Sequence, residues 1–284
     1  MIKKYVSHLI PRFLERPLRR HMEKQQLSHI PAAECETAHL LADKEVNMEK
    51  IFNSSEIEKE WNLFVKEIAK FNIPDGTGGA NPGEGRAIFY LITYLNPHAI
   101  LEIGTHIGTS TVHIAAAIRN NKKMLNSKPI KLLSVDIADV NNSSTRPWLK
   151  SGTTYSPFEM VDMLRCSDFV TFIRSASLKY MAECRQKYDF IFLDGDHKAR
   201  TVYQEIPAAL RLLEKGGVIL LHDYFPNLKP LWSDNSVIPG PFLATERLIA
   251  ECQQVKVLPL GRLPWPTKCN TNLASLALLV RKTA

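Results

Sequence analysis

Residues 99–111 read AILEIGTHIGTST, and this stretch decides the fold that the sequence predicts. Its first five residues are a short apolar run of the kind that forms a buried strand. Gly104 and Gly108 follow, four positions apart, and let the backbone turn tightly and approach a ligand closely. Thr109 then begins a helix whose first backbone N–H groups point toward that ligand. We therefore predict a strand, a glycine turn and a helix at the edge of a binding site.

Strands and helices alternate after this turn. We expect further strands over residues 130–136, 170–173, 188–194 and 218–221, and helices over residues 109–119, 157–166, 178–185, 198–214 and 242–254. Such alternation is typical of an α/β fold, in which helices cover both faces of a doubly wound, mostly parallel sheet. The last two strands, residues 255–258 and 273–280, have no helix between them and predict an antiparallel hairpin at the sheet edge.

The residues before the glycine turn predict a helical extension. Residues 30–72 carry an apolar stripe and are expected to be helical. A Gly- and Pro-rich loop over residues 74–85 follows, and then a buried helix over residues 86–95. We divide the chain into an N-terminal basic arm with a helical extension, residues 1–73, and a ligand-binding domain, residues 74–284.

The first 26 residues form the basic arm. They contain seven Lys or Arg and two Glu, and so hold five of the net +7 charges of the chain. Apolar residues at spacings of three and four place a stripe on one helical face: Ile2, Tyr5, Val6, Leu9, Ile10, Phe13 and Leu14. Pro11 and Pro17 are expected to divide the arm into two short helical pieces. Such a face either packs on the protein or on a second copy of the chain, which we favour, or lies on anionic lipid as a peripheral membrane contact.

Composition excludes several classes of protein. Outside the arm the chain is nearly neutral, so we expect no nucleic-acid partner. An apolar fraction of 45% excludes a disordered chain, and no uncharged apolar run approaches the ~20 residues of a membrane span. Five scattered cysteines without a Cys-x-x-Cys pair favour a reduced, cytoplasmic protein over a disulfide framework or a zinc site: Cys35, Cys166, Cys184, Cys252 and Cys269.

Acidic and imidazole side chains follow three of the expected strands. Asp136 ends the second strand, where a carboxylate can hold the two hydroxyls of a ribose. Asp194-Gly-Asp-His197 follows the fourth strand and His222-Asp223-Tyr224 follows the fifth. Because the carboxyl ends of neighbouring parallel strands meet at one rim, these two clusters are expected to lie together. Their mutual repulsion would be offset by a divalent cation such as Mg²⁺, which prefers carboxylate oxygens.

The order of these motifs resembles the class I S-adenosylmethionine-dependent methyltransferases over residues 86–284. The resemblance implies the strand order 3-2-1-4-5-7-6 with strand 7 antiparallel, and makes residues 74–284 the cofactor-binding domain. It implies that Glu102, Gly104, Thr105 and Gly108 surround the amino-acid part of S-adenosylmethionine and that Asp136 binds its ribose. Ser175, Ala176 and Ser177 would lie beside the adenine. In this sequence Ser175-Ala176 stands where the family more commonly has Gly-Asp.

The Asp-Gly-Asp-His and His-Asp-Tyr clusters resemble a bacterial subgroup that includes metal-dependent sugar O-methyltransferases. That resemblance implies that Asp194 and Asp223 are ligands of Mg²⁺ or another divalent cation, with Asp194 also part of the catalytic centre. His197 would be the catalytic base. His222 would be a third ligand where the subgroup commonly has an acid. Imidazole suits Mn²⁺, Fe²⁺ or Zn²⁺ better than Mg²⁺, so His222 has the alternative of lying beside the cofactor or the acceptor.

The expected function is therefore S-adenosylmethionine-dependent O-methylation, assisted by a divalent metal. The methyl acceptor is expected to be a small hydroxylated molecule, with a sugar or glycosylated natural product ahead of a catechol-like aromatic. One alternative is an NAD-type oxidoreductase, against which the absence of Gly-x-Gly-x-x-Gly counts. Another is a non-catalytic protein of the same fold that binds a membrane or a partner.

Overall fold

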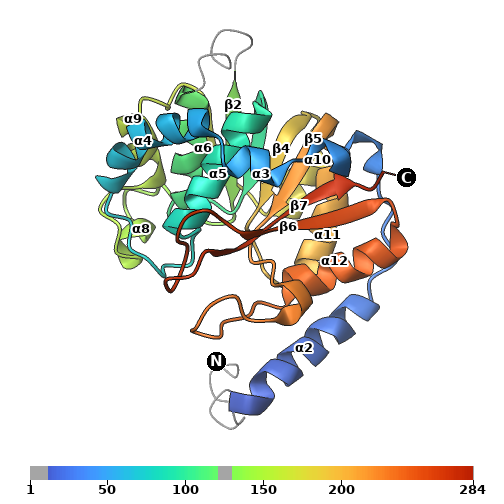
Figure 1. Ribbon diagram of the computed structural model, residues 1–284. Coiled ribbons are helices and arrows are strands. Elements are labelled where there is room, and N and C mark those ends of the chain that lie inside the picture. Colours follow the sequence, from blue (N-terminus) through green and yellow to red (C-terminus); the bar gives the residue numbers. More distant parts are fainter. Residues whose placement is uncertain (1–11, 121–129, 284) are drawn as a thin grey trace.

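A seven-stranded sheet forms the centre of the protein (Figure 1). The computed structural model describes residues 12–120 and 130–283. The strand order is β3-β2-β1-β4-β5-β7-β6, as the resemblance implied. The strands are β1 (Ala99–Ile103), β2 (Lys131–Asp136), β3 (Val170–Arg174), β4 (Tyr188–Leu193), β5 (Leu213–Leu221), β6 (Val255–Arg262) and β7 (Leu273–Arg281). β1 to β5 pair in parallel, and β7 runs antiparallel to both β5 and β6. The α/β fold and the terminal hairpin are thus confirmed.

Helices cover both faces of the sheet, and each face has its own apolar core. On one face lie α3 (Met48–Phe52), α4 (Ser55–Ala69), α5 (Pro82–Leu95), α6 (Thr109–Asn120) and α9 (Pro157–Met163). On the other lie α10 (Ser177–Glu183), α11 (Ala199–Leu210) and α12 (Gly240–Glu251). Ile100 belongs to the first core and Leu101 to the second, because successive strand residues point to opposite faces. The short helix α8 (Pro147–Lys150) lies in the loop after β2.

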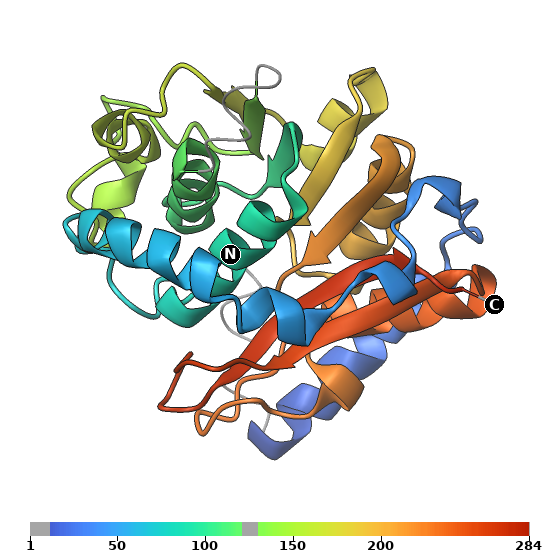
Figure 2. The same cartoon turned by 45° about the horizontal axis from the view of Figure 1, so that its top comes forward.

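Residues 30–47 are not the helix that the sequence predicts. They are largely extended, with only two 3-10 turns, Thr37–His39 and Asp43–Glu45. Leu40 bridges to Gly217 of β5, and Ala42 bridges to Arg281 of β7. Backbone hydrogen bonds to the sheet therefore replace those of a helix here, as the path of this segment in Figure 2 illustrates. The helical expectation holds for α3 and α4, which share a core with α5 and α6; the boundary at residue 73 stays a prediction.

Part of the basic arm is one continuous helix, α2 (Arg12–Ser28), so the predicted break at Pro17 is wrong. Pro17 is the sixth residue of α2, just past the first four backbone N–H groups, which have no helical partner, so it removes a hydrogen bond only near the start of the helix. Leu27 is buried against α11 and α12, and the Glu23 carboxylate accepts a hydrogen bond from the backbone N–H of Ala199 at 2.7 Å. Packing on the body is thus confirmed for this part of the arm. Most of the predicted stripe, from Ile2 to Ile10, and Pro11 lie outside the described residues.

Two further helix ends differ from the prediction by four residues. α11 ends at Leu210, four residues earlier than expected, because Leu213 is buried and pairs with Tyr188 of β4. β5 consequently begins at Leu213 and includes Gly216, whose φ of +82° suits glycine. α5 begins at Pro82, inside the expected Gly-rich loop, with Asn81 as its N-cap. Among the described residues, no helix is both long and apolar enough to cross a membrane.

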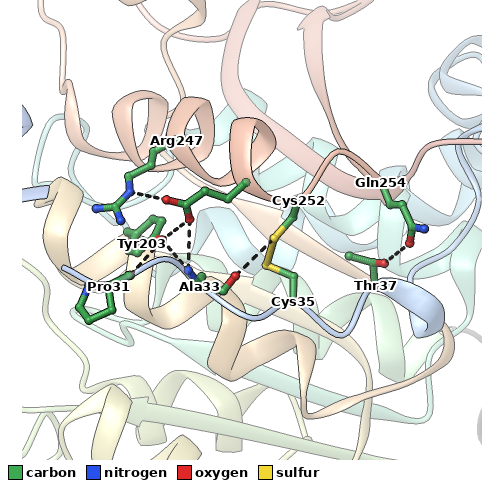
Figure 3. The surroundings of a disulfide bond; sticks show 9 residues. Pro31, Ala33, Cys35, Thr37, Tyr203, Arg247, Cys252 and Gln254 are labelled. Atoms are coloured by element: carbon green, nitrogen blue, oxygen red, sulfur yellow. Dashed lines mark hydrogen bonds and ion pairs between the residues drawn. A yellow bond between two sulfur atoms is a disulfide. The ribbon is translucent and has the colours of Figure 1, made fainter. Parts of the chain in front are cut away.

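A disulfide joins Cys35 to Cys252, which contradicts the expected set of reduced cysteines (Figure 3). The two residues are 217 positions apart in sequence, so their spacing gave no signal, but the fold brings their Cα atoms to 6.4 Å. The bond fastens the extended segment that follows α2 to the carboxyl end of α12. Next to it, the backbone N–H of Ala33 donates to the Tyr203 hydroxyl at 2.8 Å, and Thr37 donates to the Gln254 side chain at 2.7 Å.

Candidate active site

The glycine turn after β1 lies against the loop that follows β4. Gly104 has a φ of +97°, and a Cβ at this position would come within 2.1 Å of the Asp194 carbonyl oxygen. Gly108 has a φ of +81°, and a Cβ there would meet Pro157 at 2.9 Å. Both positions therefore require glycine, for conformation and for space. The close approach also links the turn to the acidic cluster that begins at Asp194.

Glu102 and Thr105 lie beneath this turn. The fully buried Glu102 carboxylate accepts hydrogen bonds from Ser110 at 2.5 Å, Thr111 at 2.6 Å and Ser134 at 2.6 Å. Burial raises the pKa of Glu102 to about 7, against the opposing effect of these three hydroxyls. Thr105 is also buried, and its hydroxyl lies 2.6 Å from that of Ser134. Both side chains therefore hold the first turn of α6 against β1 and β2.

Asp136 lies at the rim, at the carboxyl end of β2. Its two carboxylate oxygens accept hydrogen bonds from the backbone N–H groups of His106 and Ala138, both at 2.8 Å. The backbone N–H of Ser175 donates to the Asp136 carbonyl oxygen at 2.8 Å, which places residues 175–177 next to Asp136. The fold thus brings together the glycine turn, Asp136 and the Ser-Ala-Ser segment, which are distant in sequence.

Glu205 is a residue of this rim that the sequence did not reveal. Its carboxyl is nearly fully buried and accepts a hydrogen bond from Ser177 at 2.5 Å. Burial raises its pKa to about 7, opposed by that hydrogen bond. In the sequence it stands between Gln204 and Ile206 of α11, where an acid is usually read as solvent-exposed.

Asp194, His197 and Asp223 form a cluster at the ends of β4 and β5. One potential ligand atom from each lies within 4.8 Å of the others. His197 Nδ1 is 3.4 Å from an oxygen of Asp223. Asp196 is not part of this cluster, because its carboxylate is bound by the Lys198 ammonium at 3.0 Å and by Thr201 at 2.8 Å. The motif after β4 and the motif after β5 therefore lie together at one rim, as predicted.

His222 lies below the cluster, between three carboxylates. Its Nδ1 is 2.9 Å from Asp194 and 3.6 Å from Asp223, and its Nε2 is 3.2 Å from Glu84. Burial alone would lower the pKa of His222, but the charges of Asp194 and Asp223 and the contact with Glu84 raise it well above its usual value. The raised pKa favours the protonated ring, whose Nε2 is hydrogen-bonded to Glu84, while Nδ1 has no hydrogen bond to any described residue. The predicted part of His222 in metal binding stays a prediction, because the group of possible ligand atoms that lie together comes from Asp194, His197 and Asp223.

Glu84 is the other site residue that the sequence did not reveal. It is 1% exposed, and its carboxylate accepts hydrogen bonds from the backbone N–H and the hydroxyl of Ser275 at 2.6 and 2.8 Å. Burial would raise its pKa, but the bond to His222 and the charge on that ring lower it. A signal for this residue was present in the sequence. A helix start is indicated by Asn81 as N-cap, Pro82 after it and Glu84 in the first turn, but these residues stand in a stretch that the sequence analysis assigned to a loop.

Comparison with known proteins supports the same interpretation of the fold. Residues 101–224 match a family model described as a methyltransferase domain. The structure is similar to that of the O-methyltransferase TomG from Streptomyces achromogenes in complex with SAM, at 15% identity over 81% of this chain and 91% of that one, with a TM-score of 0.51. It is also similar to an O-methyltransferase from Bacillus cereus in complex with SAH, at 19% identity over 81% and 92%, with a TM-score of 0.50. The family match covers residues 101–224, and the two solved structures share the fold described above.

Proposed function

We propose that this protein is an S-adenosylmethionine-dependent O-methyltransferase that acts on a small hydroxylated molecule with the help of a divalent cation. One observation carries the proposal. The Asp194–His197–Asp223 cluster lies against the glycine turn, at the same rim as Asp136. A site for a nucleoside and a site for acid–base chemistry thus adjoin each other. The two similar structures, solved with SAM and with SAH, support this choice of cofactor.

The residues after β1, β2 and β3 would bind the cofactor. The turn that contains Gly104 and Gly108 would bind the amino-acid part, with Glu102 and Thr105 holding the turn in shape. Asp136 would accept hydrogen bonds from the ribose, and Ser175, Ala176 and Ser177 would lie beside the adenine. S-adenosylmethionine supplies an electrophilic methyl group on its sulfonium, so the protein needs to position it and to make the acceptor oxygen nucleophilic.

The cluster residues fit a divalent cation. Asp194 and Asp223 offer carboxylate oxygens and His197 offers a ring nitrogen, all within 4.8 Å. The buried Asp194 Oδ1 has no hydrogen bond from any described residue, although His222 lies 2.9 Å away. With His197 kept as the base, the carboxylate oxygens of Asp194 and Asp223 would hold a cation such as Mg²⁺ or Mn²⁺. Such a cation lowers the pKa of a bound acceptor hydroxyl.

His197 and His222 would have different tasks. The His197 side chain is 33% exposed, so it can reach the acceptor hydroxyl and take its proton, while Asp223 orients the ring from 3.4 Å. His222 would hold its positive charge and offset the repulsion between Glu84, Asp194 and Asp223. We therefore assign proton removal to His197, cation binding to the two aspartates, and support of those aspartates to His222.

The acceptor would enter between the loops that leave this rim. The loops over residues 141–156 and 224–241 both carry aromatic and polar side chains, which suit a sugar ring or an aromatic ring. A sugar or glycosylated metabolite remains our first choice, with a catechol-like aromatic second. A screen of such molecules with a methyl-labelled donor would identify the acceptor.

Calorimetry and activity together test the proposal. We expect S-adenosylhomocysteine to bind the wild-type protein and to bind Asp194→Ala and Asp223→Ala with nearly unchanged affinity. Methyl transfer and its dependence on a divalent cation should be lost in both variants. Absence of binding at millimolar S-adenosylhomocysteine would refute the cofactor, and full turnover in excess chelator would refute the cation.

A further inference from the structure

A groove with one basic wall and one apolar wall lies between α2 and the loop before α12. The cavity has a volume of about 690 Å³. Arg19, Arg20 and Lys24 line it from α2, and Val237, Ile238 and Pro239 line it from the loop. Figure 1 shows α2 running below the sheet, with this loop between α2 and the carboxyl ends of the strands. The volume lies within the ~300–1,000 Å³ usual for small-molecule sites.

The positive charges of this groove are not neutralised by the described residues. Arg19, Arg20 and Lys24 are exposed, and none of the three has an ion pair with an acid among the described side chains, residues 17–120 and 130–283. Glu23, the acid next to Lys24, points away from them and binds the backbone N–H of Ala199 at 2.7 Å. Three unpaired cations around one concave surface attract an anion and favour one with several oxygens, such as phosphate.

Both walls of the groove are attached to the segment that carries His197. On one side Glu23 of α2 accepts the hydrogen bond from Ala199. On the other side Gly240, next to Pro239, lies so close to the His197 carbonyl oxygen that a Cβ there would be 1.9 Å away. The groove therefore adjoins the reaction centre of the proposed function and is not a remote surface feature.

We propose that this groove binds the anionic end of the methyl acceptor, and that the acceptor carries a phosphate or diphosphate group. The cations of α2 would hold the phosphate, the apolar wall would contact the body of the molecule, and the hydroxyl to be methylated would reach His197. This inference rests on the proposed function, because it takes the bound molecule to be the methyl acceptor. Binding of an anion in the groove can be measured separately. It gives the basic arm a role in substrate binding.

The test compares two double variants of equal charge. Arg20 and Lys24 are one helical turn apart on the groove side of α2, so Arg20→Gln/Lys24→Gln removes two charges from the groove. Lys131→Gln/Lys215→Gln removes two exposed charges at the amino ends of β2 and β5, which is the opposite rim of the sheet. Inorganic pyrophosphate is the probe, titrated by calorimetry into the full chain. S-adenosylhomocysteine is titrated into all three proteins as a check of folding and of the proposed function.

We expect pyrophosphate to bind the wild type and the Lys131/Lys215 variant with equal affinity. We expect it to bind the Arg20/Lys24 variant about tenfold more weakly, since each of the two lost phosphate contacts contributes roughly threefold. Equal weakening in both variants, or in neither, would overturn the inference. Should Arg20→Gln/Lys24→Gln lose its fold, the single change Arg20→Gln gives the same comparison. Failure of S-adenosylhomocysteine to bind the wild type would refute the proposed function and leave the pyrophosphate result standing.

An anionic membrane surface is the alternative partner that could bind these basic residues. Leu18 and Met22 are exposed on the same helix, at 42% and 50%. We favour a small molecule because the basic residues line a concave site, whereas a membrane contacts a flat or convex one. Sedimentation with phosphatidylserine vesicles separates the two. Vesicle binding in the absence of any pyrophosphate binding would overturn the inference in favour of the membrane.

Discussion

The contact between Glu84 and His222 predicts a large difference between two Glu→Gln changes. In Glu84→Gln the new amide can still accept from Ser275, but its NH₂ group then faces His222 Nε2, which in the wild type lies 3.2 Å from a carboxylate oxygen of Glu84. The change also leaves a buried imidazolium with one carboxylate fewer. Removing one partner of a buried pair costs about 3–5 kcal/mol. Because Asp194 and Asp223 still neutralise His222 in part, we expect the free energy of unfolding to fall by about 2–4 kcal/mol.

Glu58→Gln is the matched control. Glu58 pairs with Arg86 at 3.3 Å, but its side chain is 56% exposed. Exposed pairs contribute at most about 1 kcal/mol, so this variant should unfold within about 1 kcal/mol of the wild type. Urea denaturation followed by circular dichroism measures both. Equal effects of the two changes would refute the buried charge network below the candidate site.

Glu102→Gln should change how stability depends on pH. The folded-state pKa of Glu102 is raised from 4.5 to about 7. The protonated carboxyl therefore contributes its full stability to the wild type below pH 4.5, and this contribution is lost as the pH rises through 7. The variant should therefore gain up to about 3 kcal/mol relative to the wild type between those pH values, and a constant difference in urea midpoints would contradict this. Cys35→Ser should cost about 2–5 kcal/mol under oxidising conditions and nothing in excess reductant, measured by thermal unfolding, with Cys269→Ser as an exposed, unpaired control. In Asp223→Asn, calorimetric titration with Mn²⁺ should show affinity reduced by about tenfold or more, and unchanged affinity would remove Asp223 from the cation site.

The sequence predicted the sheet and its binding rim because these depend on local patterns. Each strand from Ala99–Ile103 onward is a short apolar run bounded by turn residues. The glycines at 104 and 108 show where the backbone has to turn, and parallel pairing then places Asp136, Asp194 and Asp223 on one edge. These residues could be grouped without a structure because their positions follow from strand order alone.

The parts that the sequence did not predict depend on contacts between distant segments. Residues 30–47 have helical composition but pair with β5 and β7, two neighbouring strands inside the sheet, and only the completed sheet offers those partners. Glu84 is buried because Ser275 and His222, far away in sequence, approach it from two strands. Cys35 and Cys252 likewise meet through the fold. Local propensity carries no information on such contacts.

The N-terminal arm has a role in the structure that its charge alone did not indicate. Its charge suggested a lipid contact or a packing helix, and α2 does pack on α11 and α12. The same helix also presents Arg20 and Lys24 to a groove beside His197. Deleting the arm is therefore expected to spare cofactor binding and to impair binding of the acceptor.

The most direct test of the account is calorimetric titration of the wild-type protein and Asp136→Ala with S-adenosylhomocysteine. Asp136 lies at the rim beside the glycine turn, and we propose that its carboxylate accepts hydrogen bonds from the ribose. Loss of charged hydrogen bonds of this kind costs about 1.5–3 kcal/mol, which corresponds to roughly tenfold to a hundredfold in affinity. We predict binding to the wild type and that degree of weakening in the variant. No binding to the wild type, or equal binding to both, would contradict the proposed cofactor site.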